Sequence, residues 1–105
     1  MDQIKEIISE LSEHKATDIK VYSDINTYQY MIVASGNSER HTKALATIIA
    51  AMCKKQYQII PKIEGIGMQQ WVCVSMGYCL IHIFVEEARL EFNLDELWKD
   101  KMIDI

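Results

Sequence analysis

Three sets of residues in the sequence have types and spacings that could carry chemistry. The first is the run Ser35-Gly36-Asn37-Ser38, which lies between an apolar segment and a helical pattern, the context of a phosphate or anion cradle. The run lacks both GxGxxG and GK[ST]. A tight turn with an N-cap accounts for every residue in it, so we favour capping. A nucleotide-binding or nucleotidyltransferase-like enzyme using this strand–turn–helix unit remains the alternative.

The second set is Cys73 with His82, which the hairpin described below places opposite each other. Zinc would need at least one further protein ligand, and His14 and His41 lie on separate predicted elements. A nucleophilic cysteine would need a group to orient the imidazole and an oxyanion hole, and neither can be named. We therefore expect a buried thiol beside a hydrogen-bonded imidazole, with no metal and no cofactor.

The third set is the carboxylates, which do not converge. Asp18 and Asp24 do not form a DxD motif, and two-metal chemistry needs several acids at one site. The pairs Glu86-Glu87 and Asp95-Glu96 are typical of solvated helical acids. We expect no catalytic residues, and a protein that is not an enzyme.

Charge is distributed unevenly over the 105 residues, whose net formal charge is −4. Residues 1–35 carry −3, residues 36–85 carry +3 and residues 86–105 carry −4. An acidic chain is a poor candidate for wrapping nucleic-acid phosphates, so little direct RNA contact is expected. The bases of the predicted second helix, Arg40, Lys43, Lys54 and Lys55, fit a solvated face, and contact with an acidic partner or RNA is the lesser interpretation.

The compartment is predicted from cysteines and from the first residues. Three cysteines without CxxC spacing favour a reducing compartment, and neither a secretory nor a transit pattern opens the chain, so a cytoplasmic protein is expected. Residues 66–85 hold no Asp, Glu, Lys or Arg, but polar residues and Gly77 interrupt them. A β-hairpin explains this stretch better than a membrane span.

The length suits one domain, residues 1–105, and periodicity predicts its helices and strands. The predicted elements are a helix over 2–14, strands over 17–22 and 28–35, a helix over 38–56, a short strand over 57–60, loops at Pro61 and 65–67, a hairpin over 71–84 and a helical segment from Glu86. The apolar centre of the second strand, residues 30–34, indicates a strand covered on both faces.

The pairing register of the hairpin follows from the position of its turn. With Gly77-Tyr78 as a two-residue turn, Met76 faces Cys79 and Trp71 faces Phe84. Alternation then predicts one wholly apolar core face: Val72, Val74, Met76, Cys79, Ile81 and Ile83. The other face is mixed: Trp71, Cys73, Ser75, Leu80, His82 and Phe84. It fits equally a partner-binding surface and a thinner layer beneath the C-terminal helices.

An ordered set of motifs resembles the Iojap family, the ribosomal silencing factors. The set comprises Lys15-Ala16-x-Asp18-Ile19, the run Tyr30-Met31-Ile32-Val33-Ala34-Ser35-Gly36-Asn37-Ser38-x-Arg40-His41, Ile63-Glu64-Gly65, Trp71-Val72, Gly77, Ile81-His82-Ile83-Phe84, and Arg89-x-x-Phe92-x-Leu94-x-x-Leu97-Trp98. The resemblance implies an α/β (α+β) fold, a mixed sheet flanked by helices, with a nucleotidyltransferase-like core without catalytic acids. It also implies binding to the large ribosomal subunit through its ribosomal protein fourteen, steric block of subunit joining, and lower translation when nutrients are short.

The resemblance also implies a partner-binding site. Carried over residue by residue, that site comprises Glu64, Gly65, Trp71, Ser75, Met76 and Tyr78. Gln29, Ser75 and Tyr78 stand where the family usually has acids, and Met76 replaces a commonly larger or apolar residue, so a less electrostatic interface is expected. The apolar residues of the mixed hairpin face leave open a dimerisation or scaffold domain, with the free protein a monomer or weak homodimer.

Overall fold

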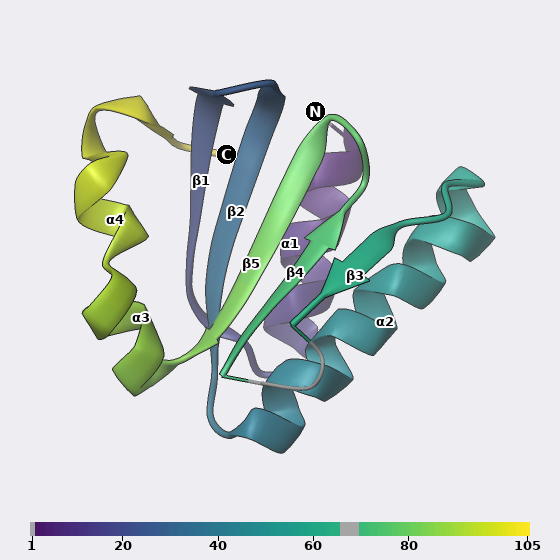
Figure 1. The fold of residues 1–105 in the computed structure, drawn as a ribbon. Helices are drawn as coiled ribbons and strands as arrows, with labels where there is room; N and C mark the ends of the chain where they lie inside the picture. The colour runs from purple at the N-terminus through teal and green to yellow at the C-terminus, as the bar shows by residue number, and fades with distance from the viewer. Residues whose placement is uncertain (1, 66–69) are drawn as a thin grey trace.

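The protein forms one sheet with helices on both faces (Figure 1). The structure is a computed structural model and describes residues 2–65 and 70–105. The helices are α1 (Asp2–Glu13), α2 (Glu39–Tyr57), α3 (Glu86–Phe92) and α4 (Leu94–Leu97), followed by a 3-10 turn, η1 (Lys99–Lys101). The strands are β1 (Thr17–Ile25), β2 (Tyr28–Gly36), β3 (Lys62–Glu64), β4 (Trp71–Ser75), β5 (Cys79–Val85) and β6 (Met102–Ile103).

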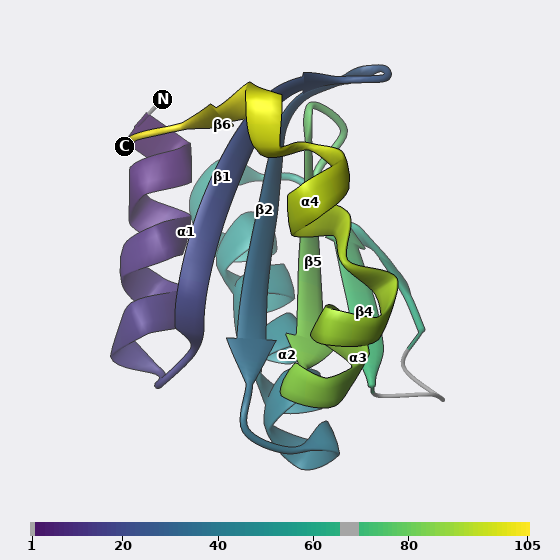
Figure 2. The same cartoon turned by 90° about the vertical axis from the view of Figure 1, so that its left-hand side faces the viewer.

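The sheet is mixed, as predicted. Its strand order is β3-β4-β5-β2-β1-β6. The central strands β2 and β5 are parallel, and every other neighbouring pair is antiparallel. Helices α1 and α2 cover one side, here called the first face, and α3 and α4 cover part of the opposite side, the second face (Figure 2). Each face therefore has its own apolar core.

Helices α1 and α2 form because their apolar residues recur at helical spacing. Ile4, Ile7 and Leu11 are fully buried against the first face, so the predicted helix presents an apolar stripe to the sheet. Helix α2 begins after Ser38, whose Oγ accepts a hydrogen bond from the backbone N–H of His41 at 3.1 Å, so the predicted N-cap is confirmed. The helix ends at Tyr57, before Gln58 in the left-handed region with φ of 55°.

Strand β2 is buried from Met31 to Gly36, because it lies between neighbours in the sheet and is covered on both faces. The predicted hairpin register is also confirmed. Trp71 pairs with Phe84 and Ser75 with Leu80, and the N–H of Met76 bonds to the carbonyl of Cys79 at 2.9 Å. The whole predicted core face of the hairpin is buried beneath α1 and α2.

Two of the predicted secondary-structure elements are wrong. Residues 57–60 are not a strand: Tyr57 still belongs to α2, and the strand forms after Pro61, at Lys62–Glu64. The C-terminal segment is not one helical stretch, because Asn93 adopts the left-handed region, divides α3 from α4, and the chain then returns to pair β6 with β1. Of the loop predicted over 65–67, residues 66–67 lie outside the described residues.

Candidate partner-binding surface

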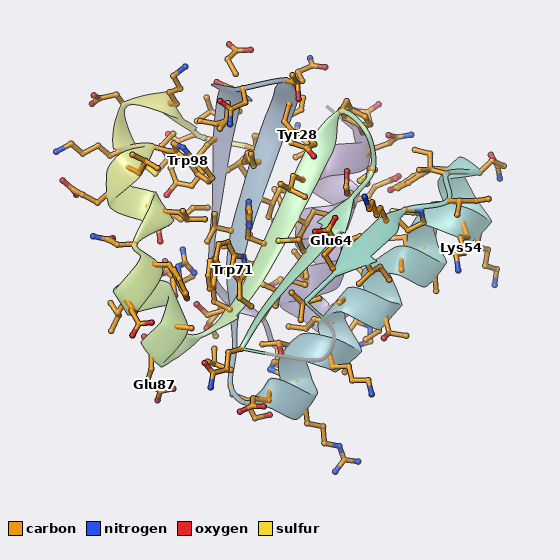
Figure 3. The ribbon with its side chains drawn as sticks, in the orientation of Figure 1. Tyr28, Lys54, Glu64, Trp71, Glu87 and Trp98 are labelled. Atoms are coloured by element: carbon orange, nitrogen blue, oxygen red, sulfur yellow. The ribbon has the colours of Figure 1, made fainter. Side chains whose placement is uncertain are left out.

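Part of the second face is left open beside α3 and α4. Those helices cover Met31, Val33 and Phe84, whereas the outer strands β3 and β4 extend past them. A pocket of about 200 Å³ lies here, lined by Tyr28, Lys62, Glu64, Cys73, Ser75 and Leu80. Figure 3 shows Glu64 and Tyr28 on this stretch of the sheet, with Trp71 between it and the C-terminal helices. The mixed hairpin face thus divides into a covered part and an open part.

Glu64 gives the open surface its negative charge. Its carboxylate lies 3.4 Å from Nζ of Lys62, and both side chains are mostly exposed. An exposed ion pair of this kind contributes little to folding stability and exchanges readily. The Glu64 carboxylate is therefore free to pair with a cation on another molecule.

Trp71 is the central member of an aromatic cluster. Its ring stacks on Phe84 with centroids 4.9 Å apart and packs against Phe92 at 4.7 Å. Its indole N–H donates to Nδ1 of His82 at 3.0 Å. Trp71 is half-buried by these contacts, so it supports the α3–sheet junction as well as contributing apolar surface at the edge of the open region.

His82 and Cys73 form the packed pair that the sequence predicts. The Sγ of Cys73 lies 3.4 Å from Nδ1 of His82. Burial lowers the pKa of His82 to about 4, and burial followed by the charge of Glu64 raises the pKa of Cys73 to about 11. A reactive pair needs shifts in the opposite directions, toward thiolate and imidazolium. The geometry therefore favours a neutral imidazole that accepts at Nδ1 and carries its hydrogen on the buried Nε2.

Gly65 is required by the geometry of the β3–β4 connection. Its φ is +86°, and a Cβ placed there would lie 2.3 Å from the carbonyl oxygen of Trp71. A side chain at this position would push β3 away from the start of β4. Gly65 thus lets β3 lie close to β4, with Glu64 opposite Cys73, without offering a side chain of its own.

The remaining predicted site residues lie near the hairpin turn, on different sides of the sheet. Ser75 lines the open pocket, whereas Met76 is buried in the first-face core. Tyr78 packs edge-on against Tyr30 and donates its hydroxyl to the side-chain oxygen of Gln3 in α1. The structure therefore brings together Glu64 and Ser75 at the second-face pocket, with Trp71 on the same face at the other end of β4, and places Met76 and Tyr78 where they support the turn from the first face.

The residues of the predicted cradle bond to other parts of the chain. The N–H of Asn37 donates to Nδ1 of His41 at 2.9 Å, and Nε2 of that ring lies 2.8 Å from the carbonyl of His14. Ser35 is buried, and its hydroxyl accepts from Arg89. The Asn37 N–H is thus bonded to the imidazole of His41, and Ser38 caps the helix, which confirms the capping interpretation of this run.

A buried polar network at the start of the C-terminal segment is missed by the sequence analysis. Arg89 is 5% exposed and binds Asp95 through two hydrogen bonds, of 2.9 and 3.0 Å. It also donates to the Asp18 carbonyl at 2.6 Å and the Ser35 hydroxyl at 2.8 Å. The Tyr22 hydroxyl donates to Asp95 at 2.5 Å. Asp95 is therefore not the solvated helical acid that was predicted. Helical spacing could not predict its contact with Arg89, because the helix is interrupted at Asn93 between the two residues.

Among residues 2–65 and 70–105, no three His, Cys, Asp or Glu side chains gather as a metal site would require. Within the same residues, no helix combines the length and apolarity that crossing a membrane demands.

The fold defines a small mixed α+β domain, and the open, partly aromatic surface of its sheet is typical of a protein that binds a partner. The chain belongs to the family described as ribosomal silencing factor during starvation, whose model matches residues 1–105. The resemblance seen in the motifs is thereby confirmed, and the family is one of ribosome-associated regulators of translation.

Individual relatives agree. A ribosomal silencing factor RsfS of Zymomonas mobilis is 38% identical over 69 residues, which cover 66% of this chain and 52% of that protein. One of Haemophilus influenzae is 29% identical over 102 residues, 93% of this chain and 99% of that protein. A crystal structure of a Chromobacterium violaceum protein has a TM-score of 0.84 at 28% identity and covers 93% of this chain and 85% of that one. The chain spans about half of several curated relatives, including 46% of a mouse protein named for mitochondrial assembly of the large ribosomal subunit.

Proposed function

We propose that this protein silences ribosomes by binding the large subunit through its ribosomal protein fourteen. Bound there, it occupies the inter-subunit face and prevents the small subunit from joining, which lowers translation when nutrients are limited. The action is steric and requires neither bond-making nor a cofactor. The proposed setting is the cytoplasm, with contacts made mainly to protein rather than to RNA.

The observation that carries the proposal is the open part of the second face. It combines an exposed carboxylate at Glu64 with aromatic and apolar surface at Trp71, Phe92 and Leu80. Large aromatic side chains beside a polar rim are the usual composition of an energetic hot spot. A ribosomal protein carries the complementary basic charge, because it must lie against RNA phosphates.

The carried-over residues have distinct proposed roles. Glu64 pairs with a basic side chain, Trp71 presents the edge of its ring cluster, and Ser75 contributes a polar rim contact. Gly65 fixes the position of Glu64. Met76, together with Tyr78, fixes the turn from behind.

The expected interface is less electrostatic than that of the family in general. Gln29 and Tyr78 lie together, because the backbone N–H of Gln29 bonds to the carbonyl of Tyr78 at 2.9 Å, and both are neutral, as is Ser75. Rim charges mainly steer association and set its salt dependence. We expect binding to isolated large subunits to weaken only gently between low and physiological salt, and a steep decline would contradict this.

The site is tested by reversing its one acid. Glu64→Lys should weaken binding to isolated large subunits by about tenfold or more, since it replaces an attractive contact with a repulsive one. Glu91→Lys, the same change at an exposed position of α3, is the matched control and should bind normally. Equal binding by both variants would show that the interface lies elsewhere.

A further inference from the structure

A second surface, on the other side of the outer strand, forms a wide, shallow groove. Helix α2 packs against β4, β5 and β2, and β3 extends beyond them beside the helix (Figure 1). Between helix and strand lies a groove of about 520 Å³, lined by Thr47, Ala50, Ala51, Lys54, Lys55 and Ile63. We call it the α2–β3 groove. It shares no lining residue with the pocket on the second face.

The backbone of β3 offers hydrogen bonds toward this side. The backbone N–H of Met76 bonds to the carbonyl of Cys79, and hydrogen-bonded pairs alternate along an antiparallel ladder. Val72 and Val74 therefore direct their backbone groups toward β5, as Met76 does. The intervening residues Cys73 and Ser75 therefore direct their backbone groups toward β3. By the same alternation, the N–H and C=O of Ile63 point away from β4, toward the outer edge of the sheet.

The side chains add apolar contact and positive charge. Ile63 is 36% exposed and faces the groove, and the alanines of α2 form its floor. Lys54 and Lys55 stand at the C-terminal end of α2, where Figure 3 shows Lys54 on the outer side of the helix. Within the part of the chain that the structure describes, neither lysine forms an ion pair, and none of the groove residues is acidic.

We propose that the α2–β3 groove binds a short extended segment of another protein, one with an apolar side chain next to carboxylates. The segment pairs with Ile63 along the sheet edge, places its apolar side chain on the alanines, and directs its acids to Lys54 and Lys55. An apolar floor and an outward amide suit a peptide, whereas an RNA backbone would use only the two lysines.

The shortness of the edge limits the affinity and supplies selectivity. Strand β3 has only three residues, Pro61 precedes it without an N–H, and Lys62 begins it. These features discourage indiscriminate strand pairing. Binding therefore depends on the groove and the lysines together, so a partner lacking acids is rejected.

The test is a titration of the isotopically labelled protein, followed by amide chemical shifts, with an acetylated peptide Glu-Val-Thr-Val-Glu-Asp. Shifts should concentrate at Ile63 and at α2 residues 47–55. Lys54→Glu with Lys55→Glu should weaken binding by about tenfold. Lys43→Glu, an equal change on the same helix outside the groove, should leave it unchanged.

Three results would overturn the proposal: no localised shifts at millimolar peptide, equal binding of a peptide with lysines in place of its acids, or shifts produced by oligouridylate but not by the peptide. None of the probes includes a ribosome. The outcome is therefore independent of whether the second face binds ribosomal protein fourteen.

Discussion

Replacing Asp95 with alanine should destabilise the protein far more than its position in a short surface helix would indicate. The substitution removes the carboxylate that accepts two hydrogen bonds from Arg89 and one from Tyr22. The Arg89 side chain is only 6% exposed, so its charge stays buried after the substitution. Its remaining hydrogen-bond acceptors are neutral, the Asp18 carbonyl and the Ser35 hydroxyl, and the Asp18 carboxylate lies 3.6 Å away.

The size of the effect follows from burial. Removing one partner of a buried ion pair costs about 3–5 kcal/mol, and the 30% exposure of Asp95 lets water replace part of the contact, which favours the lower end, about 3 kcal/mol. With a urea dependence of about 1–2 kcal/mol per molar for a chain of this size, the unfolding midpoint should fall by about 2 M.

Urea unfolding followed by tryptophan fluorescence measures this directly, because Trp98 packs on Tyr22 with ring centroids 5.9 Å apart. Glu96→Ala is the matched control. Its carboxylate pairs with Lys99 at 3.0 Å, but both side chains are 63% exposed, so the loss should stay below about 0.5 kcal/mol. If Asp95→Ala is no more destabilising than Glu96→Ala, the argument from burial is refuted.

A double substitution and the pH dependence of stability distinguish the loss of a buried ion pair from general disruption of the fold. Asp95→Leu combined with Arg89→Met should recover much of the stability, since no charge is left buried. Burial alone would raise the pKa of Asp95, but hydrogen bonds from Arg89 and Tyr22 and the charge of Arg89 hold it below its usual value. The stabilisation is therefore complete above the unfolded pKa of about 3.9 and is lost as the pH falls through the lower folded value.

Three other predictions concern the sheet and its open surface. Gly65→Ala should destabilise the protein by about 2–3 kcal/mol in urea unfolding, whereas Gly77→Ala, with a φ of +96° but open space around it, should cost about 1 kcal/mol; equal losses would contradict the close approach at Gly65. Because the folded pKa of His82 is about 4 against about 6.5 unfolded, stability should fall as the pH drops from 6.5 to 4, and His82→Phe should remove that dependence in pH-dependent thermal melts. Trp71→Ala should lower the free energy of unfolding by about 3 kcal/mol and should also weaken binding to large subunits, whereas Trp71→Phe should fold with its ring stack retained. A Trp71→Ala variant that is fully stable in calorimetry would show that the aromatic cluster does not stabilise the fold.

Local patterns were sufficient to predict most of the sheet. The hairpin register followed from one two-residue turn, because strand side chains alternate strictly and the turn leaves no freedom of pairing. The stripe of α1 and the cap at Ser38 likewise depend on residues a few positions apart. Such features are decided by neighbours in the chain, which the sequence displays directly.

The errors arose where distant residues decide the structure. Strand β3 forms because Lys62–Glu64 pair with β4. The apolar residues Ile59 and Ile60 favour a strand more strongly by local pattern, so the strand was predicted before Pro61 rather than after it. Asp95 is a network residue because the left-handed Asn93 turns the chain back over Arg89. The spacing of apolar residues does not indicate that the chain turns back at Asn93. Since α3 and α4 cover the second face, which part of the mixed hairpin face is covered and which is open could not be predicted either.

The central claim is that the protein prevents the two ribosomal subunits from joining. Purified small and large subunits, mixed with the protein and separated by sedimentation through a sucrose gradient, test it most directly. We predict that the protein travels with the large subunit and that the peak of joined ribosomes falls as protein is added, with Glu64→Lys ineffective at the same concentration. A normal peak of joined ribosomes with the protein bound to the large subunit, or protein left at the top of the gradient, would contradict it.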